Sequence, residues 1–168
     1  MPDYPYIIDP FTQVYEKIWE TLTNAPEVSR RVKPVNRIMR TGQRVGPFRD
    51  TVTAADLPEL DVVPAGGEAN PFQTSTSGQF LQMFDVQVSA GGMSLDRSQL
   101  FPLKWAVLKA VARAGDTLGL DFVKSVRITD MAEGPTLRDE RQAVGWQAII
   151  RVQVVLFITR VHLVATEN

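Results

Sequence analysis

The chain has 168 residues, a hydrophobic content of 44% and a formal net charge of −1. These values predict one globular domain over residues 1–168, large enough to bury a core without disulfides or metal ions. The sequence contains no cysteine, which excludes a disulfide framework, a thiolate zinc site and a cysteine nucleophile.

The two ends of the sequence lack the patterns of exported or membrane-spanning chains. Met1 to Pro5 show no basic segment followed by an apolar run, so we expect no signal peptide. Residues 144–163 are apolar, but Arg151, Gln153 and Arg160 interrupt them with the periodicity of a strand. We therefore expect no membrane-spanning helix and no membrane partner.

The first predicted element is an amphipathic helix that begins after Asp9 and ends near Asn24. Asp9 is a suitable N-cap, and Pro10 at the first helical position has no N–H that needs a partner. Pro26 disfavours helical backbone at Ala25 and so ends the helix. The apolar face recurs at helical spacing and consists of Phe11, Val14, Tyr15, Ile18, Trp19 and Leu22.

The middle of the chain predicts strands, a loop and a second helix. Short strands are expected at 36–40 and 59–63, followed by a breaker-rich loop from Pro64 to Gly78. Alternating apolar residues predict a third strand over 79–90. The second helix is expected to be capped by Asp96 or Ser98, to start near 98–101 with Pro102 in its first turn, and to end at Gly115.

The last part of the chain predicts a long hairpin. One strand covers 122–130, with Phe122, Lys124, Val126, Ile128 and Asp130 expected on one face. The other covers 146–159, and at about 3.3 Å per residue it would span about 46 Å, far beyond a usual strand. Its excess length predicts either a protruding hairpin arm or an edge that pairs with another chain. The charged tip, 133–141, is expected to be a solvated loop.

The order of these elements predicts an α+β fold. We expect an antiparallel sheet of four to five strands, with two helices packed on one face and the long C-terminal β-hairpin. No βαβ pattern repeats along the chain, and separate helices on one face of an antiparallel sheet are the natural alternative.

Motifs for catalysis or cofactor binding are not found, so we predict no enzyme. The one histidine, His162, has neither a Gly-x-Ser-x-Gly motif nor a sequence-placed acid to accompany it. Ala90-Gly91-Gly92-Met93 lies between a strand and a helix, but it lacks Gly-Lys-Ser/Thr and a third glycine at dinucleotide spacing, so we interpret it as a turn. No Asp-x-Asp-x-Asp spacing occurs, and no metal or cofactor is expected.

Charge is distributed in two adjoining blocks of opposite sign. Residues 28–49 contain seven basic and no acidic side chains, and residues 50–70 contain five acidic and no basic ones. Three interpretations of the basic block stay open: contact with DNA phosphates, a strand edge kept soluble by charge, and a seam between subunits in which it meets the acidic block.

Several segments resemble the tail terminator (tail completion, neck) proteins of tailed bacteriophages and prophages. The similarity lies in the N-terminal helix ending near Asn24, the Asn36-Arg37-Ile38 strand, and Asp56-Leu57-Pro58-Glu59-Leu60 leading into a strand closed by Pro64. The strand, helix and hairpin from Phe80 to Leu163 are similar too, so the resemblance covers nearly the whole chain.

This resemblance implies a structural virion protein of the tail or neck that is assembled in the host cytoplasm. Its members form a hexameric ring, a homo-oligomer that caps the tail tube, stops its polymerisation and joins it to the head. The implied partners are the tail tube protein and a head–tail connector or stopper protein, with genomic DNA passing through the lumen. No cofactor is implied.

The resemblance also suggests positions for particular side chains. The residues expected to face the lumen or a neighbouring subunit are Arg30, Arg31, Arg37, Arg40 and Arg44. The residues expected on partner-facing loops are Glu68, Phe72, Glu133, Arg138, Asp139, Glu140 and Arg141.

Two other classes of function remain open. A monomeric nucleic-acid-binding α+β domain would use the basic block from Arg30 to Arg49. A small-molecule enzyme would need a pocket with convergent polar groups, which the sequence does not identify.

Overall fold

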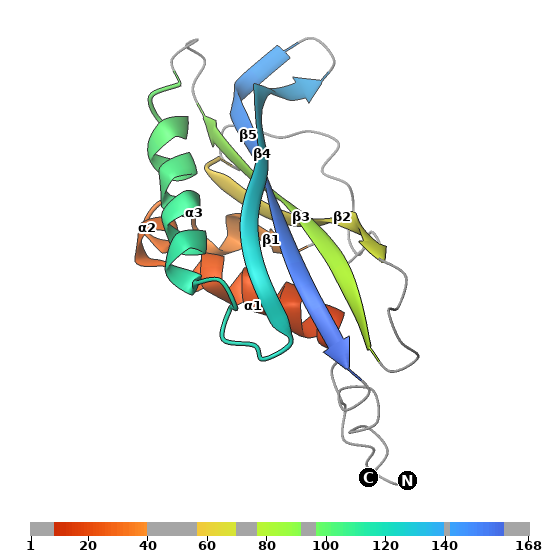
Figure 1. Ribbon diagram of the computed structural model, residues 1–168. Coiled ribbons are helices and arrows are strands. Elements are labelled where there is room, and N and C mark those ends of the chain that lie inside the picture. Colours follow the sequence, from red (N-terminus) through yellow and green to blue (C-terminus); the bar gives the residue numbers. More distant parts are fainter. Residues whose placement is uncertain (1–8, 40–56, 70–76, 92–96, 140–141, 160–168) are drawn as a thin grey trace, which may run out of the picture.

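The computed structural model describes residues 9–39, 57–69, 77–91, 97–139 and 142–159. Within these residues the chain forms one five-stranded sheet and two long helices (Figure 1), which confirms the predicted α+β fold. The elements are α1 (Pro10–Asn24), α2 (Pro26–Ser29), the 3₁₀ turn η1 (Pro34–Asn36), β1 (Arg37–Met39), β2 (Glu59–Ala69), β3 (Ser77–Gly91), α3 (Leu100–Ala114), β4 (Val123–Asp139) and β5 (Gln142–Thr159).

Helix α1 begins and ends where the sequence predicts. The Asp9 Oδ1 atom accepts a hydrogen bond of 2.9 Å from the Thr12 N–H, so the N-cap satisfies a backbone donor that the helix leaves open. Its buried residues include Ile18 and Leu22. Tyr15 lies between the helix and the sheet: its ring stacks on Phe84, and its hydroxyl donates to the Val62 carbonyl oxygen at 3.1 Å.

Helix α3 starts within the predicted window, at Leu100. Gln99 occupies the N-cap position and makes no side-chain capping bond there, while Asp96 lies outside the described residues. The end agrees with the sequence, because Gly115 follows the last helical residue with a φ of 73° that favours glycine.

The strands lie in the order β1-β2-β3-β5-β4. Three of the four pairings are antiparallel, but β1 pairs parallel with β2, so the sheet is mixed and not wholly antiparallel as predicted. The reason is the length of the connection: residues 40–58 lie between the two strands, and a parallel pair needs such a long crossover.

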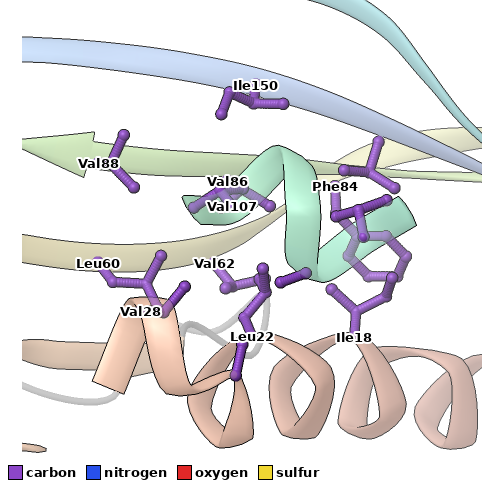
Figure 2. Packing of buried hydrophobic residues seen from close by; sticks show 14 of the residues in the cluster. Ile18, Leu22, Val28, Leu60, Val62, Phe84, Val86, Val88, Val107 and Ile150 are labelled. Carbon is purple, nitrogen blue, oxygen red and sulfur yellow. The ribbon is translucent and has the colours of Figure 1, made fainter. Parts of the chain in front are cut away.

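Both long helices cover one face of the sheet, as predicted. The core lies between these helices and the sheet (Figure 2). We call this side of the sheet the helix-covered face. In β3, in β5 and in β2 up to Pro64, the strand residues on this face are the even-numbered ones, because β-strand side chains alternate between faces. The fully buried ones are Leu60, Val62, Phe84, Val86, Val88, Ala148, Ile150, Val152, Val154 and Leu156.

The long strand β5 is neither a protruding arm nor an edge, so both predictions made from its length are wrong. It has 18 residues, and β3 pairs with it from Gly145 to Thr159 while β4 pairs with it from Gln142 to Leu156. Its neighbours are nearly as long, with 15 and 17 residues. The excess length is therefore used inside the sheet, and the two edge strands are β1 and β4 (Figure 1).

Both predicted loops are shorter than expected because strand pairing extends into breaker-rich sequence. Strand β2 continues to Ala69 through an irregularity between Pro64 and Gly66, where Gly66 adopts a φ of +94°. Strand β4 continues to Asp139 and tolerates Pro135 because it lies at the sheet edge. The pairing energy of a neighbouring strand thus overrides the local turn preference.

Gly145 and Gly134 offer a matched pair of substitutions in the hairpin. A Cβ atom at Gly145 would collide with the backbone carbonyl of Ala90 on β3, whereas at Gly134 nothing lies within 4 Å. We expect Gly145→Ala to lower the free energy of unfolding by about 1–3 kcal/mol, the usual effect of overpacking. Gly134→Ala should change it by less than about 0.5 kcal/mol. Urea denaturation followed by circular dichroism measures both, and equal values would contradict the close approach at Gly145.

Candidate assembly surfaces

Strand β4 exposes its backbone edge and both of its faces over one continuous stretch. Every residue from Arg127 to Glu133 is exposed, and no other described strand pairs with the outer side of β4. Two of these residues are large and apolar: Ile128 is 37% exposed and Met131 is 49% exposed. An edge strand with free backbone groups and exposed apolar side chains is a template for pairing with another chain.

A bulge determines which β4 residues share a face. Ile128 lies opposite Val152 and Asp130 lies opposite the next β5 residue, Arg151, so Thr129 is an extra residue. Asp130 therefore lies on the opposite face from Ile128, and the predicted common face of the two residues is wrong. The bulge also brings Met131 onto the helix-covered face, opposite Ile150.

Helix α3 carries two exposed aromatic side chains. Phe101 is 53% exposed and Trp105 is 58% exposed, and their spacing of one helical turn places them on the same flank. The Lys104 ammonium pairs with the Glu133 carboxylate, which holds this flank of the helix beside β4. We call Phe101, Trp105, Ile128 and Met131 together the β4–α3 surface.

Glu133 belongs to an ion cluster within the subunit and not to a loop, contrary to the prediction. Its Oε1 atom accepts from Lys104 Nζ, and its Oε2 atom lies 3.3 Å from Arg97 Nη1. The Arg97 guanidinium in turn lies 4.1 Å above the centre of the Trp146 ring. The hydrogen bond from Lys104 is the main cause that lowers the pKa of Glu133 below its usual value.

The described part of the basic block divides into exposed and engaged side chains. Arg30, Arg31 and Lys33 are exposed and form a small cationic surface, which we call the basic tip. Within it, the Arg31 Nη1 atom donates to the Glu27 carbonyl oxygen at 2.7 Å. Arg37 is half-buried, and its Nε and Nη2 atoms donate to the Val32 carbonyl oxygen at 3.0 and 2.7 Å. Its Nη2 atom also reaches the Ser29 carbonyl oxygen at 3.2 Å. Arg37 therefore binds the Ser29 carbonyl at the end of α2, where helical carbonyls lack partners, and the Val32 carbonyl in the turn that follows.

The remaining predicted site residues are spread over several elements. Arg40, Arg44, Phe72, Glu140, Arg141 and His162 lie outside the described residues. Glu68 lies in β2, and Arg138 and Asp139 lie in β4, so the structure corrects their assignment to loops. Whether they face partner proteins stays a prediction.

One member of the predicted acidic block is not available to a neighbouring subunit. Asp61 is only 3% exposed, so it does not take part in a surface seam with a basic block. Asp50 and Asp56 lie outside the described residues. The basic tip is therefore exposed, whereas these three acidic residues provide no described surface for the basic tip of a neighbouring subunit to meet.

The sheet face away from the helices carries an ion pair near its centre. The Arg151 Nε and Nη2 atoms donate to the two carboxylate oxygens of Asp85 at 2.8 and 2.9 Å. Asp130 of β4 lies opposite Arg151 in the strand register. This pairing links β3 to β5 and leaves Asp130 at the exposed edge.

Neither a metal site nor a membrane helix is found in the part of the chain that the structure describes. No group of three or more histidine, aspartate or glutamate side chains there is arranged to hold an ion. Among the described helices, none is both long enough and apolar enough to cross a bilayer.

Arg37 and Arg30 provide a test of the division within the basic block. Arg37→Ala removes charged donors from the carbonyls of Ser29 and Val32 and should lower the free energy of unfolding by about 1–2 kcal/mol. Arg30→Ala removes an exposed side chain and should change it by less than about 0.5 kcal/mol. Chemical denaturation measures both, and a neutral Arg37→Ala variant would show that the observed bonds do not stabilise the fold.

The ion cluster at Glu133 predicts a pH-dependent stability difference. The folded-state pKa of Glu133 is lowered, so its contribution is present above the unfolded pKa of about 4.3 and is lost as the pH falls through the folded value. At neutral pH, Glu133→Gln should lower the free energy of unfolding by up to about 1 kcal/mol, as is usual for a surface ion pair. The difference from the natural chain should shrink below about pH 4. Urea denaturation at several pH values checks this, and a difference unchanged at low pH would contradict it.

Comparison with protein-family models gives no match, and comparison with curated proteins gives none either.

Proposed function

We propose that the chain is a structural subunit of a tailed-phage virion, a tail terminator that assembles with further copies into a ring. In this proposal the ring caps the tail tube, stops its polymerisation and joins the tail to the head connector or stopper. The subunit is made and assembled in the host cytoplasm and remains in the tail or neck of the virion.

The observation that supports an assembly role most strongly is the exposed edge of β4. Residues 127–133 leave backbone groups and apolar side chains uncovered on a strand that another chain can extend. The aromatic side chains Phe101 and Trp105 enlarge this surface. Exposed aromatic and methionine side chains are typical of the buried centres of protein interfaces.

The proposed mechanism is geometric and involves no reaction. A ring whose subunits all point the same way has two different faces, so one face can match the last layer of the tube while the other face binds the head connector. The basic tip of Arg30, Arg31 and Lys33 is exposed and suits either a neighbouring subunit or the DNA that passes through the lumen.

The test combines the purified protein with tail tubes of the same virus and uses negative-stain imaging. We expect rings or single caps at the head-proximal ends of the tubes, and tubes of unregulated length when the protein is absent. Met131→Lys on β4 should reduce capping at least tenfold, because it places a charge on the proposed interface. Val35→Lys is the matched control, since Val35 is 72% exposed and lies in η1, directly before β1 at the opposite edge of the sheet from β4. Tubes that grow to the same length with and without the protein would contradict the proposal.

The alternative function is nucleic-acid binding by a monomeric domain, and the exposed basic tip is the observation that favours it. Arg30, Arg31 and Lys33 are exposed within four consecutive positions. A mobility-shift experiment with labelled duplex DNA over a range of salt concentrations distinguishes the two functions. Binding that is lost in Arg30→Glu/Arg31→Glu/Lys33→Glu, by a protein that leaves tail tubes uncapped, would support the alternative.

A further inference from the structure

The exposed stretch of β4 has a residue pattern that is complementary to itself. When two copies of an edge strand pair in antiparallel fashion, they are related by a two-fold axis normal to the sheet. Such an axis keeps every side chain on its own face, so residues that lie opposite each other must share a face. In a regular strand with side-chain alternation, this restricts pairing to a few registers.

The bulge at Thr129 permits one register in which both faces match. Val126 and Met131 lie on the helix-covered face, opposite Val154 and Ile150 of β5. Arg127 and Asp130 lie on the other face, opposite Gln153 and Arg151. An axis between residues 128 and 129 places Arg127 against Asp130 and Val126 against Met131 of the second copy. It also places Ser125 against Ala132, and both of these residues lie on the face of Arg127.

The chemistry of these opposed residues is favourable at each position. Arg127 and Asp130 carry opposite charges and are exposed, and the symmetry produces this ion pair twice. The Asp130 Oδ1 atom accepts from the Met131 N–H at 2.8 Å within the chain, so the pair with Arg127 uses Oδ2. Val126 is half-buried and Met131 is 49% exposed, so their contact covers apolar surface. Cross-strand pairs of these kinds stabilise antiparallel strands, while like charges in the same positions destabilise them.

We propose that β4 is the docking surface for a second copy of this chain, through antiparallel pairing of residues 125–132 in the register that joins Arg127 to Asp130. The two five-stranded sheets become one continuous sheet. The exposed apolar side chains Ile128 and Met131 of both copies are then gathered around the two-fold axis.

This inference goes beyond the proposed function, because a two-fold pair is not a contact of a polar ring. A ring with different upper and lower faces is built from head-to-tail contacts, whereas the β4 pair is symmetric. The pair therefore belongs to the free subunit, and it must open before the same edge is used in a ring.

The first experiment measures dimerisation of the isolated full chain by sedimentation velocity over a concentration series. A ladder of eight residues per copy is a small interface, so we expect a dissociation constant of about 10–100 µM. Arg127→Asp places Asp against Asp at two positions and should raise that constant at least tenfold. Arg127→Asp/Asp130→Arg restores opposite charges and should return it to within about threefold of the natural value. Lys33→Asp makes the same charge change away from the ladder and should have no effect.

The second experiment fixes the register by cross-linking and does not depend on affinity. The chain has no cysteine, so introduced cysteines are the only thiols present. Ser125→Cys/Ala132→Cys should form a covalent dimer under mild oxidation, because opposed residues are within reach of a disulfide. Ala132→Cys alone should not, since the two copies of residue 132 lie seven positions apart along the ladder, about 23 Å.

Three outcomes would overturn this inference: a monomer at about 500 µM, a dimer that is insensitive to Arg127→Asp, or equal cross-linking through Ala132→Cys alone. Circular dichroism confirms that each variant is folded, which is expected because all the substituted residues are partly or fully exposed. Tail proteins are absent from both experiments. A chain that dimerises in this register but leaves tail tubes uncapped would refute the proposed function and not this inference.

Discussion

The pairing of β3 with β5 holds the rest of the subunit in place. It runs without a register shift from Ser77 opposite Thr159 to Gly91 opposite Gly145, whereas the pairings of β2 and β4 each contain irregularities. A slip of one residue would move every apolar side chain of one strand away from α1 and α3. It would also separate Asp85 from Arg151, the ion pair on the other face. Packing on one face and charge on the other therefore specify the same register.

The regular elements of this fold were predictable from the sequence, and the irregular ones were not. Helices α1 and α3 have apolar side chains at a constant helical period, and β5 has an apolar residue at every even position from 144 to 158, so their burial follows from spacing alone. The bulge at Thr129 adds one residue to β4 and reverses the faces that follow it. Pattern analysis cannot detect this shift, because the position of a bulge depends on the partner strand. The parallel pairing of β1 is equally hidden, since it arises from a long connection and not from the three residues of the strand.

The candidate surfaces were only partly predictable for a related reason. A run of arginines indicates charge but not where each side chain points. Arg30 is exposed, whereas Arg37 donates to the carbonyl oxygens of Ser29 and Val32. Glu133 is a similar case, because the sequence around it suggests a solvated loop and its partners Lys104 and Arg97 come from a distant segment. The exposed edge of β4 became visible only when the strand order placed β5 inside the sheet. Sequence spacing thus identified the side chains that fill the core better than those that reach the surface.

The hydrogen bond between Tyr15 and the Val62 carbonyl makes the packing of α1 against β2 dependent on pH in the alkaline range. Burial, with a smaller effect from the charge of Asp61, raises the pKa of the Tyr15 phenol to about 12. Only the protonated phenol can donate to a carbonyl oxygen. The stability that it contributes is fully present below the unfolded tyrosine pKa of about 10 and is lost as the pH rises toward the folded value. In strong base the packing of α1 on β2 is therefore weakened, because the Tyr15 hydroxyl loses its hydrogen bond to the Val62 carbonyl oxygen. Ionisation of Tyr15 then reports the loosening of the helix from the sheet.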